Sequence, residues 1–419
     1  MGKKSGRQAQ PRGSRNGYDS DDASASFCGS VASNDTDRSM DVDTNDELTQ
    51  EEAFHEHIEA LLEKRTTTRV TALKKIEALL VQYIPLDLLM DKYDKATLSP
   101  RANQLIGSAD TLQSNVLHIL RRPSIAEGVL GAQVLALMAL IMGENEDGFY
   151  NQIKGPLHLL IKSETQSSEV RAMALQALGT VCFICSSDEE DTHAVMAACE
   201  AHLGDASSAL AVAALDTWGC LASTLPSAYL VDDPFLTTQM EVFLQLLEHA
   251  DVEVRSSAGE NIALLFEALA TAHVVYPDRD VIAAQLLALS KDSSKKTSKR
   301  DRKEQRSVFR DVHKTVADDV SPSVTFTFQH EVLRFQDWCT LKQYATLKKW
   351  LHVGFQEHLK YNNTVRGLLD LPLTSEEQSR VEKRDTLAKN SGARKQQSEV
   401  MKDQRQRRMN QKNLFLADY

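Results

Sequence analysis

The residue types that carry catalysis or bind metals are few in this chain and poorly placed for either role. Cys182 and Cys185 form a Cys-x-x-Cys pair, and His55 and His57 flank one glutamate. A structural zinc site needs four ligands, and no second cysteine pair or spaced histidine pair accompanies the first. The two histidines fall on opposite sides of a helix, and no P-loop, G-x-S-x-G or G-x-G-x-x-G motif occurs. We therefore expect the cysteines to pack in a core, with no enzymatic activity, metal, cofactor or small-molecule substrate.

The charged residues of this chain are unevenly distributed along the sequence. The 419 residues carry a formal net charge of −11, but this total combines two parts of opposite sign. Residues 1–290 hold 21 basic and 42 acidic side chains, whereas residues 291–419 hold 27 basic and 17 acidic ones. Such an asymmetry is typical of a chain in which one part faces a polyanion. The sequence therefore predicts an acidic, protein-facing body and a basic, RNA-facing carboxy-terminal third.

Two segments of that third hold most of the candidate contacts, residues 291–303 and 389–412. The second has eight basic and two acidic residues, and a helix that is polar all round cannot be held by a core. Lys and Arg bind nucleic acid by displacing condensed counterions from phosphates. The alternatives are a solvated linker or nuclear localisation signal for the first segment and a solvated helix for the second. Our hypothesis is contact with RNA or the ribosome through Lys295, Lys296, Lys299, Arg300, Arg302, Lys303, Arg394, Lys395, Lys402, Arg405, Arg407, Arg408 and Lys412.

The elements that would position these segments are almost all helices. Aromatic residues make up 6% of the chain, with 18 Gly and 10 Pro, which argues against an all-β sandwich or a turn-rich α/β enzyme. Residues 1–46 are polar and are predicted to be a disordered amino-terminal arm. From 47 to 290, apolar residues recur every three or four positions, which indicates amphipathic helices. The expected helices are Glu51–Lys64, Thr68–Val81, Gln133–Met142, Ser168–Cys185, Ser208–Thr224, Phe235–His249 and Val252–Leu269.

An internal repeat specifies how these helices are organised. Arg171 and Arg255 stand in similar strings 84 residues apart, which is two steps of 42, and Arg69 stands in an earlier copy. A period of 40–47 residues with helix pairs indicates HEAT or armadillo repeats, in which stacked pairs form one core. The fold class is therefore mainly α, an armadillo/HEAT-like α-solenoid, and the alternative is an irregular helical bundle. We expect lone carboxylates such as Asp251 and Glu260 to cap helices or bridge repeats, and Asp251 could pair with Arg255.

Beyond residue 290 the pattern changes. Residues 291–303 are expected to be a basic linker, residues 304–372 a small, mostly helical carboxy-terminal domain, and residues 373–419 a basic helical tail. Apolar and polar residues alternate from Val324 to Phe328, which predicts a strand. A helix is expected from about Glu331, with an apolar stripe that continues to Leu351.

The chain shows the features of a protein of the cytosol or nucleus. No apolar segment follows the polar amino terminus, as a signal peptide requires. The longest apolar stretch, Val129 to Met142, is too short to span a bilayer and is expected to be a buried helix. Six cysteines spread over helical segments suggest reduced thiols. We expect a cytoplasmic protein with a second, nuclear pool as an option, and no membrane partner.

Four stretches of the chain are similar to one known family. Residues 304–312 read EQRSVFRDV and residues 256–267 read SSAGENIALLFE. The third stretch is a pattern of residues from Trp338 to Arg366, and the fourth is the basic stretch that begins at Ser391. These stretches resemble the interferon-related developmental regulator family, with one departure at His352, where the family is expected to place Gly. The motif residues are Arg306, Phe309, Arg310, Trp338, Tyr344, Gly354 and His358.

The resemblance implies an armadillo-like helical domain followed by a family-specific carboxy-terminal module without catalytic activity. It also implies one of two roles. The first is association with translationally inactive ribosomes, through ribosomal RNA and ribosomal proteins, with a carboxy-terminal helix in the path of the messenger. The second is transcriptional co-regulation through deacetylase-containing corepressor proteins. The charge split favours the first role, since the basic third would face RNA and the acidic solenoid would face basic proteins.

Overall fold

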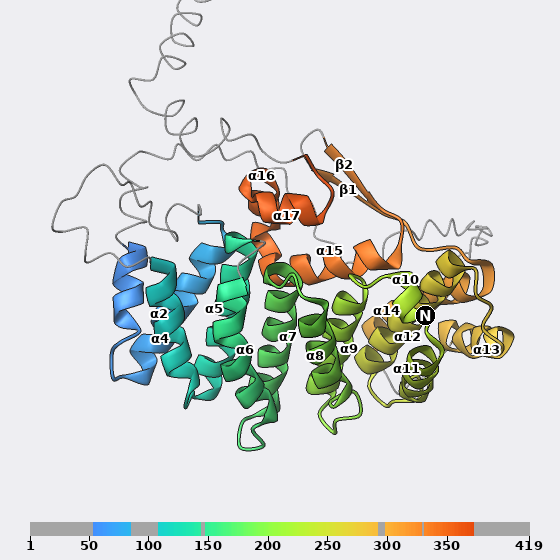
Figure 1. Cartoon of the computed structure of the whole chain (residues 1–419), viewed down its shortest axis with the longest axis horizontal. Coiled ribbons are helices and arrows are strands. Elements are labelled where there is room, and N and C mark those ends of the chain that lie inside the picture. The colour runs from blue at the N-terminus through green and yellow to red at the C-terminus, as the bar shows by residue number, and fades with distance from the viewer. Residues whose placement is uncertain (1–52, 85–107, 144–146, 292–297, 329–330, 373–419) are drawn as a thin grey trace, which may run out of the picture.

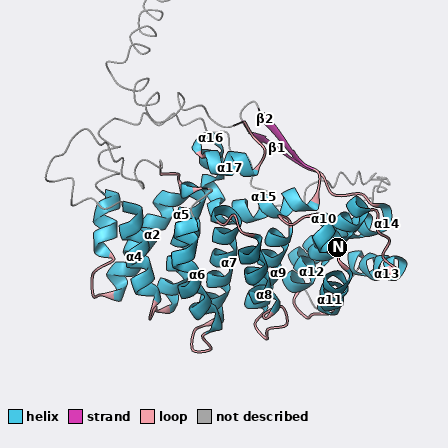
Figure 2. Cartoon of the chain, in the orientation of Figure 1, coloured by secondary structure: helices cyan, strands magenta, loops and turns pink. Residues whose placement is uncertain are grey.

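The computed structural model describes residues 53–84, 108–143, 147–291, 298–328 and 331–372. Within these ranges the regular structure is helical apart from one two-stranded sheet (Figure 2). The helices stack side by side in two rows (Figure 1), and one hydrophobic core runs through the whole array. The fold is therefore an α-solenoid of the armadillo/HEAT kind, as the repeat period predicted.

Each repeat contributes one helix to an inner row and one to an outer row. Successive inner helices begin 59, 43, 40, 44 and 47 residues apart, so the predicted period of about 42 is confirmed after the first interval. The inner row consists of α2 (Thr66–Val81), α5 (Ile125–Met142), α7 (Ser168–Cys185), α9 (Ser208–Ala222), α12 (Val252–Ala272) and α14 (Lys299–Asp318), each packed against the next. The outer row consists of α4 (Ser108–Leu120), α6 (Asp147–Lys162), α8 (Glu189–Glu200), α11 (Asp233–Leu246) and α13 (Arg279–Ser290). A helical stretch over residues 53–60 precedes α2, and the short α10 (Ser227–Leu230) precedes α11.

In each copy of the repeat, the arginine donates hydrogen bonds to backbone carbonyls of the preceding element. Arg69 donates to two carbonyl oxygens in the turn before α2, at 2.9 Å each. Arg171 donates at 2.8 Å to a carbonyl in the last turn of α6, and Arg255 donates at 2.9 Å to a carbonyl just beyond α11. Carbonyls at the end of a helix have no partner within that helix. The arginine that recurs in the sequence therefore has a structural role, because it links each of these inner helices to the element before it.

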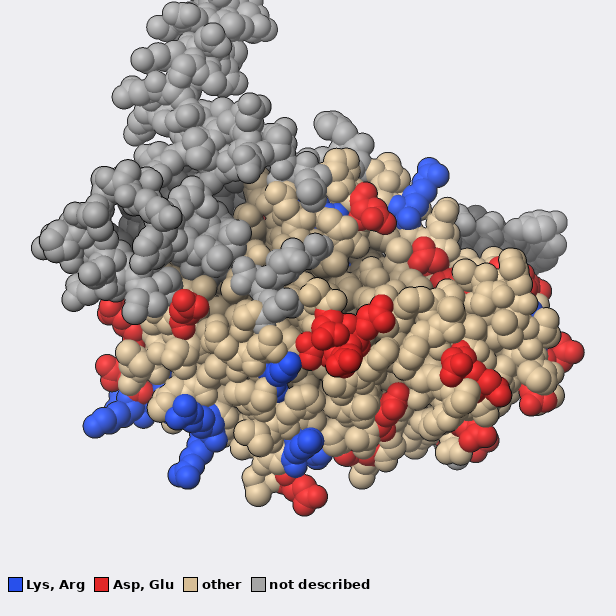
Figure 3. Space-filling model, in the orientation of Figure 1, with Lys and Arg blue, Asp and Glu red and all other residues tan. Residues whose placement is uncertain are grey.

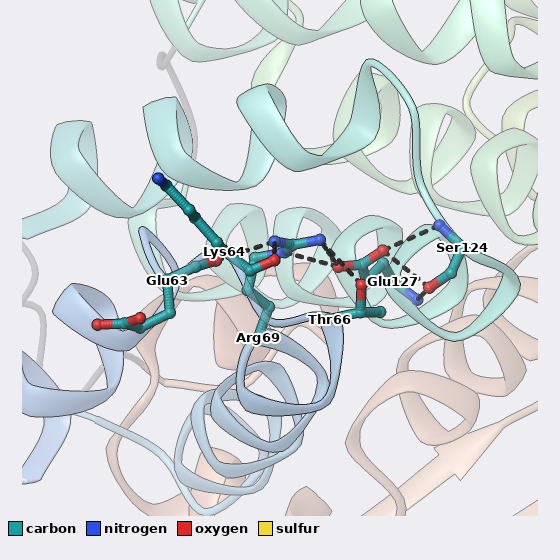
Figure 4. Close-up of polar contacts among 6 residues, drawn as sticks. All are labelled: Glu63, Lys64, Thr66, Arg69, Ser124 and Glu127. Atoms are coloured by element: carbon teal, nitrogen blue, oxygen red, sulfur yellow. Dashed lines mark hydrogen bonds and ion pairs between the residues drawn. The ribbon is translucent and has the colours of Figure 1, made fainter.

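Arg69 also joins the first two inner helices. Its guanidinium lies 2.7 Å from the carboxylate of Glu127 in the first turn of α5 (Figure 4). Glu127 in turn accepts from the backbone and side chain of Ser124, which forms a capping box with it. Burial alone would raise the pKa of Glu127, but the Ser124 and Arg69 hydrogen bonds lower it below its usual range. The carboxylate is thus charged and fixes the register of α2 on α5.

The other carboxylates behave as the sequence predicted, with one exception. Asp251 caps α12 by accepting from the N–H of Glu253 at 2.9 Å. Glu260 bridges two elements through Lys342. The expected Asp251–Arg255 pair is wrong, because Arg255 donates instead to the preceding turn and, at 2.6 Å, to Gln305 of α14.

The apolar helices lie inside the array. The expected buried helix at 129–142 is confirmed within α5. Twelve of the fifteen residues from Glu127 to Ile141 are buried. By length and composition, α5 and α7 could cross a membrane, but 67% of each is buried inside the solenoid. Two such helices are weak evidence of a membrane span, because the buried core helices of other proteins pass the same test.

The sheet corrects one expectation of the sequence analysis. The predicted strand is present as β1 (Val324–Phe328). The helix expected from Glu331 is wrong, because residues 331–335 form a second strand, β2 (Glu331–Phe335), antiparallel to β1. The helix begins at Trp338 instead, where Asp337 caps it by accepting from the N–H of Thr340 at 2.7 Å.

The remaining elements run back across the inner row, in the direction opposite to the repeats. They are α15 (Trp338–Leu351), the 3-10 turn η2 (His352–Gly354), α16 (Phe355–Tyr361) and α17 (Asn363–Leu368). We call residues 338–371 the strap. In Figure 1 α15 crosses over the ends of the solenoid helices, contacting α12, α9 and α5. The expected apolar stripe of α15 is buried, with Trp338, Leu341, Leu347 and Leu351 fully enclosed.

The expected divisions at residues 290 and 304 fall within this continuous body. Helix α14 begins at Lys299, inside the expected linker, and packs on α12 and α13 as the next pair in the array. The strap shares the core of the repeats. The arm 1–46 and the tail 373–419 lie outside the described residues, so their expected structures stay predictions.

Candidate nucleic-acid interface

Helix α14 carries the candidate interface because its two sides differ in chemistry. Ser298 caps it, accepting from the N–H of Asp301 at 3.1 Å. One side is buried against the solenoid through Val308, Phe309 and Val312. Phe309 lies so close to α12 that a Cβ added at Gly259 would be 2.8 Å from its ring. The opposite side faces solvent and is basic.

Basic residues on that side recur with the period of the helix. Lys299, Lys303, Arg306, Arg310 and Lys314 are spaced by four, three, four and four positions, which places them on one face. We call these five residues the α14 basic stripe. All are exposed except Arg306, which is half-buried. At 1.5 Å per residue the stripe is about 22 Å long. Such a row of cations can contact successive phosphates, and it presents no nucleophile or general base.

The structure therefore groups some of the predicted contacts and separates others. Of the predicted RNA contacts, Lys299 and Lys303 join the stripe, Arg300 is exposed beside it, and Arg302 is half-buried with its Nε donating to the Ser298 carbonyl. The motif residues Arg306 and Arg310 extend the same stripe, which the sequence analysis did not foresee. The other predicted contacts lie outside the described residues and stay predictions: Lys295, Lys296, Arg394, Lys395, Lys402, Arg405, Arg407, Arg408 and Lys412.

The other family-motif residues hold the strap in place. Trp338 is fully buried, and its indole N–H donates to Thr315 of α14 at 2.9 Å. Tyr344 stacks on Phe335 of β2, with ring centroids 4.5 Å apart. Gly354 and His358 pack against the end of α2. These residues act in packing, and Phe309 belongs with them.

An acidic cleft lies on the other side of α14 and was missed by the sequence analysis. Its volume is about 740 Å³, and α9, α12, α14 and α15 line it. Two lysines of the strap, Lys342 and Lys349, enter it and pair with Glu260 and Asp216 at 2.6 and 3.2 Å. The acidic lining is Asp216, Asp251, Glu253, Glu260, Asp301 and Glu304.

A sequence signal for this acidity exists. Residues 172–254 contain 13 acidic residues and no Lys or Arg. Figure 3 shows the consequence on one face, where acidic side chains dominate over α8 to α13. The cleft itself could not be read from the sequence, because it forms only when the strap folds back on the repeats.

One group of side chains has the composition of a metal site. Ligand atoms of Glu267, Asp337 and Cys339 lie within 4.8 Å of one another. Glu267, however, accepts from the backbone N–H of Trp338 at 2.9 and 3.0 Å and from Ser321. The positive end of the α15 dipole disfavours a cation there. The group is therefore better explained as the anchor of the strap.

The Cys-x-x-Cys pair is a packing feature, as expected. Cys182 and Cys185 are each 1% exposed on α7. Burial raises the pKa of the Cys182 thiol to about 11. A thiol that stays protonated at neutral pH is a poor nucleophile and a poor metal ligand.

The comparisons with known proteins now decide the family. The protein-family model described as "Interferon-related developmental regulator (IFRD)" matches residues 24–317 of this chain. This chain belongs to the interferon-related developmental regulator family. The resemblance stated from its motifs is confirmed, and the match begins at residue 24, inside the range 1–46 that was expected to be a disordered arm. The downstream motif from Trp338 to His358 lies beyond the matched range.

Two members of the family and two solved structures are similar to this chain over much of its length. Interferon-related developmental regulator 2 of Mus musculus is 27% identical over 371 residues, covering 83% of this chain and 80% of the relative. Interferon-related developmental regulator 1 of Sus scrofa is 25% identical over 334 residues, covering 75% and 70%. A designed armadillo repeat protein is 15% identical with a TM-score of 0.38, covering 61% of this chain and 98% of the other. An engineered protein is 18% identical with a TM-score of 0.37, covering 63% and 97%.

Proposed function

We propose that this regulator is a non-enzymatic, ribosome-associated protein that controls translation through its basic carboxy-terminal region. The observation that carries the proposal is the α14 basic stripe, a row of cations exposed on an otherwise acidic solenoid. The helix fixes the backbone of these cations before binding, so only their side chains lose freedom when they contact phosphates. The stripe and the basic tail would bind ribosomal RNA, and the tail would occupy an RNA path on inactive ribosomes.

The acidic body gives the proposal a second support. Repulsion keeps RNA away from the face over α8 to α13, so an RNA partner is oriented toward α14 and the tail. Ribosomal proteins are rich in Lys and Arg, and the acidic face suits them. The proposed partners are thus ribosomal RNA on the basic surface and ribosomal proteins on the acidic one, in the cytoplasm.

Sedimentation through a sucrose gradient tests the proposal. The full chain is expected to co-sediment with ribosomal particles, and a shortened chain ending at Leu373 is expected to shift toward the top. If about eight phosphates are contacted, affinity should fall with salt with a log–log slope of roughly −6. Equal co-sedimentation of both chains would show that the tail is not the anchor.

A stripe variant separates α14 from the tail. Lys299→Gln, Lys303→Gln and Arg310→Gln together remove three exposed cations, and the salt slope is expected to become shallower by about 2. The matched control replaces three exposed lysines near the amino terminus of the solenoid, Lys64, Lys74 and Lys75, by Gln. Equal slopes for the two triple variants would remove α14 from the interface.

The second candidate function is a nuclear adaptor that gathers deacetylase-containing corepressors on the solenoid. The acidic cleft favours it, because a polar, open cleft suits a basic segment of a protein partner. Purification from cells at moderate salt discriminates the two functions. Ribonuclease should remove ribosomal proteins from the first kind of complex and leave deacetylase subunits in the second.

A further inference from the structure

The strap contacts the inner helices one after another. At its start, the carboxylate of Glu267 on α12 accepts from the N–H of Trp338. Lys342 then reaches α12, Lys349 reaches Asp216 of α9 at 3.2 Å, and Trp350 donates to Thr180 of α7 at 2.7 Å. The order of these contacts is α12, α9, α7, the reverse of the order of the repeats.

The spacing of these contacts follows from helix geometry. Lys342 and Lys349 are seven residues apart, which is about 10.5 Å along a helix. Packed helices lie about 8–10 Å apart. The step from Lys342 on α12 to Lys349 on α9 fits this spacing, and Trp350, at the next position, reaches on to α7 with its long side chain.

The strap ends in a network of buried hydrogen bonds on the first two inner helices. His358 Nε2 lies 3.0 Å from the carbonyl oxygen of Leu80 at the end of α2. Asn362 Nδ2 donates at 2.7 Å to the carbonyl of Leu140 on α5 and lies 2.9 Å from His358 Nδ1. We call His358 and Asn362 the latch; they are 0% and 2% exposed. Because the Leu80 carbonyl can only accept, His358 carries its proton on Nε2, and its Nδ1 accepts from the amide of Asn362.

Close packing allows the latch only one register. A Cβ at Gly354 would lie 1.7 Å from the carbonyl oxygen of Val81. Gly143, at the end of α5 with φ of 89°, has Thr364 Oγ1 2.5 Å from the position a Cβ would take. A slip of the strap by one residue would place the side chain of Val353 or Phe355 against the Val81 carbonyl. The strap therefore ends at a defined place on α2 and α5.

The chain leaves this latch as the basic tail. Arg366, which is 7% exposed, donates to the carbonyls of Leu359 and Pro372 at 2.7 and 2.6 Å. Pro372 is the last residue before the tail. The root of the tail is thus tied to α16 and α17 and through them to α2 and α5. The α14 stripe lies at the other end of the strap, and α15 alone spans about 20 Å between them.

We propose that the strap is a spacer that holds the root of the basic tail on the amino-terminal repeats, apart from the α14 basic stripe. His358 and Asn362 are its positioning residues. The two basic segments then reach a polyanion from two fixed points, which raises the effective concentration of the second once the first is bound. This consequence rests on the proposed function, whereas the holding of the root does not.

Hydrogen exchange of the full chain tests the latch itself. In His358→Leu and in Asn362→Ala, exchange of the α16–α17 amides is expected to rise at least tenfold, while α9 and α12 stay protected. His358→Gln is expected to restore protection, because an amide can donate to Leu80 and accept from Asn362. Gln356→Ala, at an exposed position of α16, is the control. Unchanged exchange in both latch variants would overturn the proposal.

Ribosome binding by the same chains tests the spacing. The latch variants keep every basic residue, so the salt slope should stay the same while the affinity at one salt concentration falls at least tenfold. Faster exchange of the α16–α17 amides with unchanged affinity for the ribosome would show that the position of the root does not affect binding. Absence of ribosome binding by the wild-type chain would contradict the proposed function. The hydrogen-exchange result would still show whether His358 and Asn362 hold the end of the strap.

Discussion

The ammonium of Lys342 lies 2.6 Å from a carboxylate oxygen of Glu260, joining the strap to α12 across 82 positions of the sequence. The lysine is 4% exposed and the glutamate side chain 16%. Burial raises the pKa of Glu260, and Lys342 opposes that rise. We predict that Lys342→Met lowers the free energy of unfolding by about 3–5 kcal/mol, because it leaves a buried carboxylate uncompensated. Urea unfolding at pH 8 measures this loss, which should shrink at pH 5, where Glu260 can take up a proton.

Two further variants control for charge and packing. Lys349→Met removes the exposed pair with Asp216 (47% and 35% exposed), and about 1 kcal/mol or less should be lost. The double variant Lys342→Met with Glu260→Leu should recover most of the stability lost in the single variant. Equal losses for Lys342→Met and Lys349→Met would contradict a buried pair at Glu260.

His352 is the residue at which the chain departs from the family pattern, and its backbone explains the expectation of Gly. Its φ is 41° and its ψ −115°, a region that residues with a Cβ rarely adopt. The side chain of His352 is exposed. We predict that His352→Gly raises the free energy of unfolding by about 1 kcal/mol. Thermal unfolding of His352→Gly against His352→Ala measures it, and Ala should give no gain, because it keeps the Cβ.

The sequence predicted the repeats well because their signals are local. Apolar spacing, helix caps and the recurring arginines lie within one helix pair, and the helix expected at Ser168–Cys185 coincides with α7. The strand from Val324 was found for the same reason. Its partner was missed because the apolar stripe of the helix was extended back to Glu331, and because Val332 and Leu333, which are adjacent apolar residues, interrupt the polar–apolar alternation typical of a strand.

The candidate site was predictable only in part. Charge counts pointed to the residues at Lys299 to Lys303, and helix periodicity could have joined Arg306 and Arg310 to them. The acidic cleft and the latch depend on contacts between the strap and residues 82 to 278 positions away, such as the 278 that separate His358 from Leu80. No single-sequence pattern encodes such a contact, since both partners look like ordinary positions of amphipathic helices.

Gly354 provides a test of how closely the strap meets α2. A Cβ there would overlap the backbone carbonyl of Val81 at 1.7 Å, and a backbone atom cannot turn aside as a side chain can. We predict that Gly354→Ala costs more than about 3 kcal/mol of stability, or displaces η2 from α2. Gly148→Ala in α6 is the matched control, because nothing lies within 4 Å of its added Cβ. Chemical unfolding measures both, and similar values would mean that η2 does not touch α2.

His358 should make stability depend on pH. Burial lowers its pKa to about 4, while hydrogen bonds to the Leu80 and Val81 carbonyls and the nearby Glu357 pull it the other way. The unfolded chain, with a histidine pKa of about 6.5, binds more protons between these values. Stability is therefore fully present above pH 6.5 and is lost as the pH falls toward 4. Between pH 7 and pH 5 the loss from His358 should be about 2 kcal/mol. His358→Gln keeps the hydrogen bonds and cannot titrate, so urea unfolding should show a pH dependence smaller by that amount. An identical pH dependence in the two chains would mean that His358 is not buried in its neutral form.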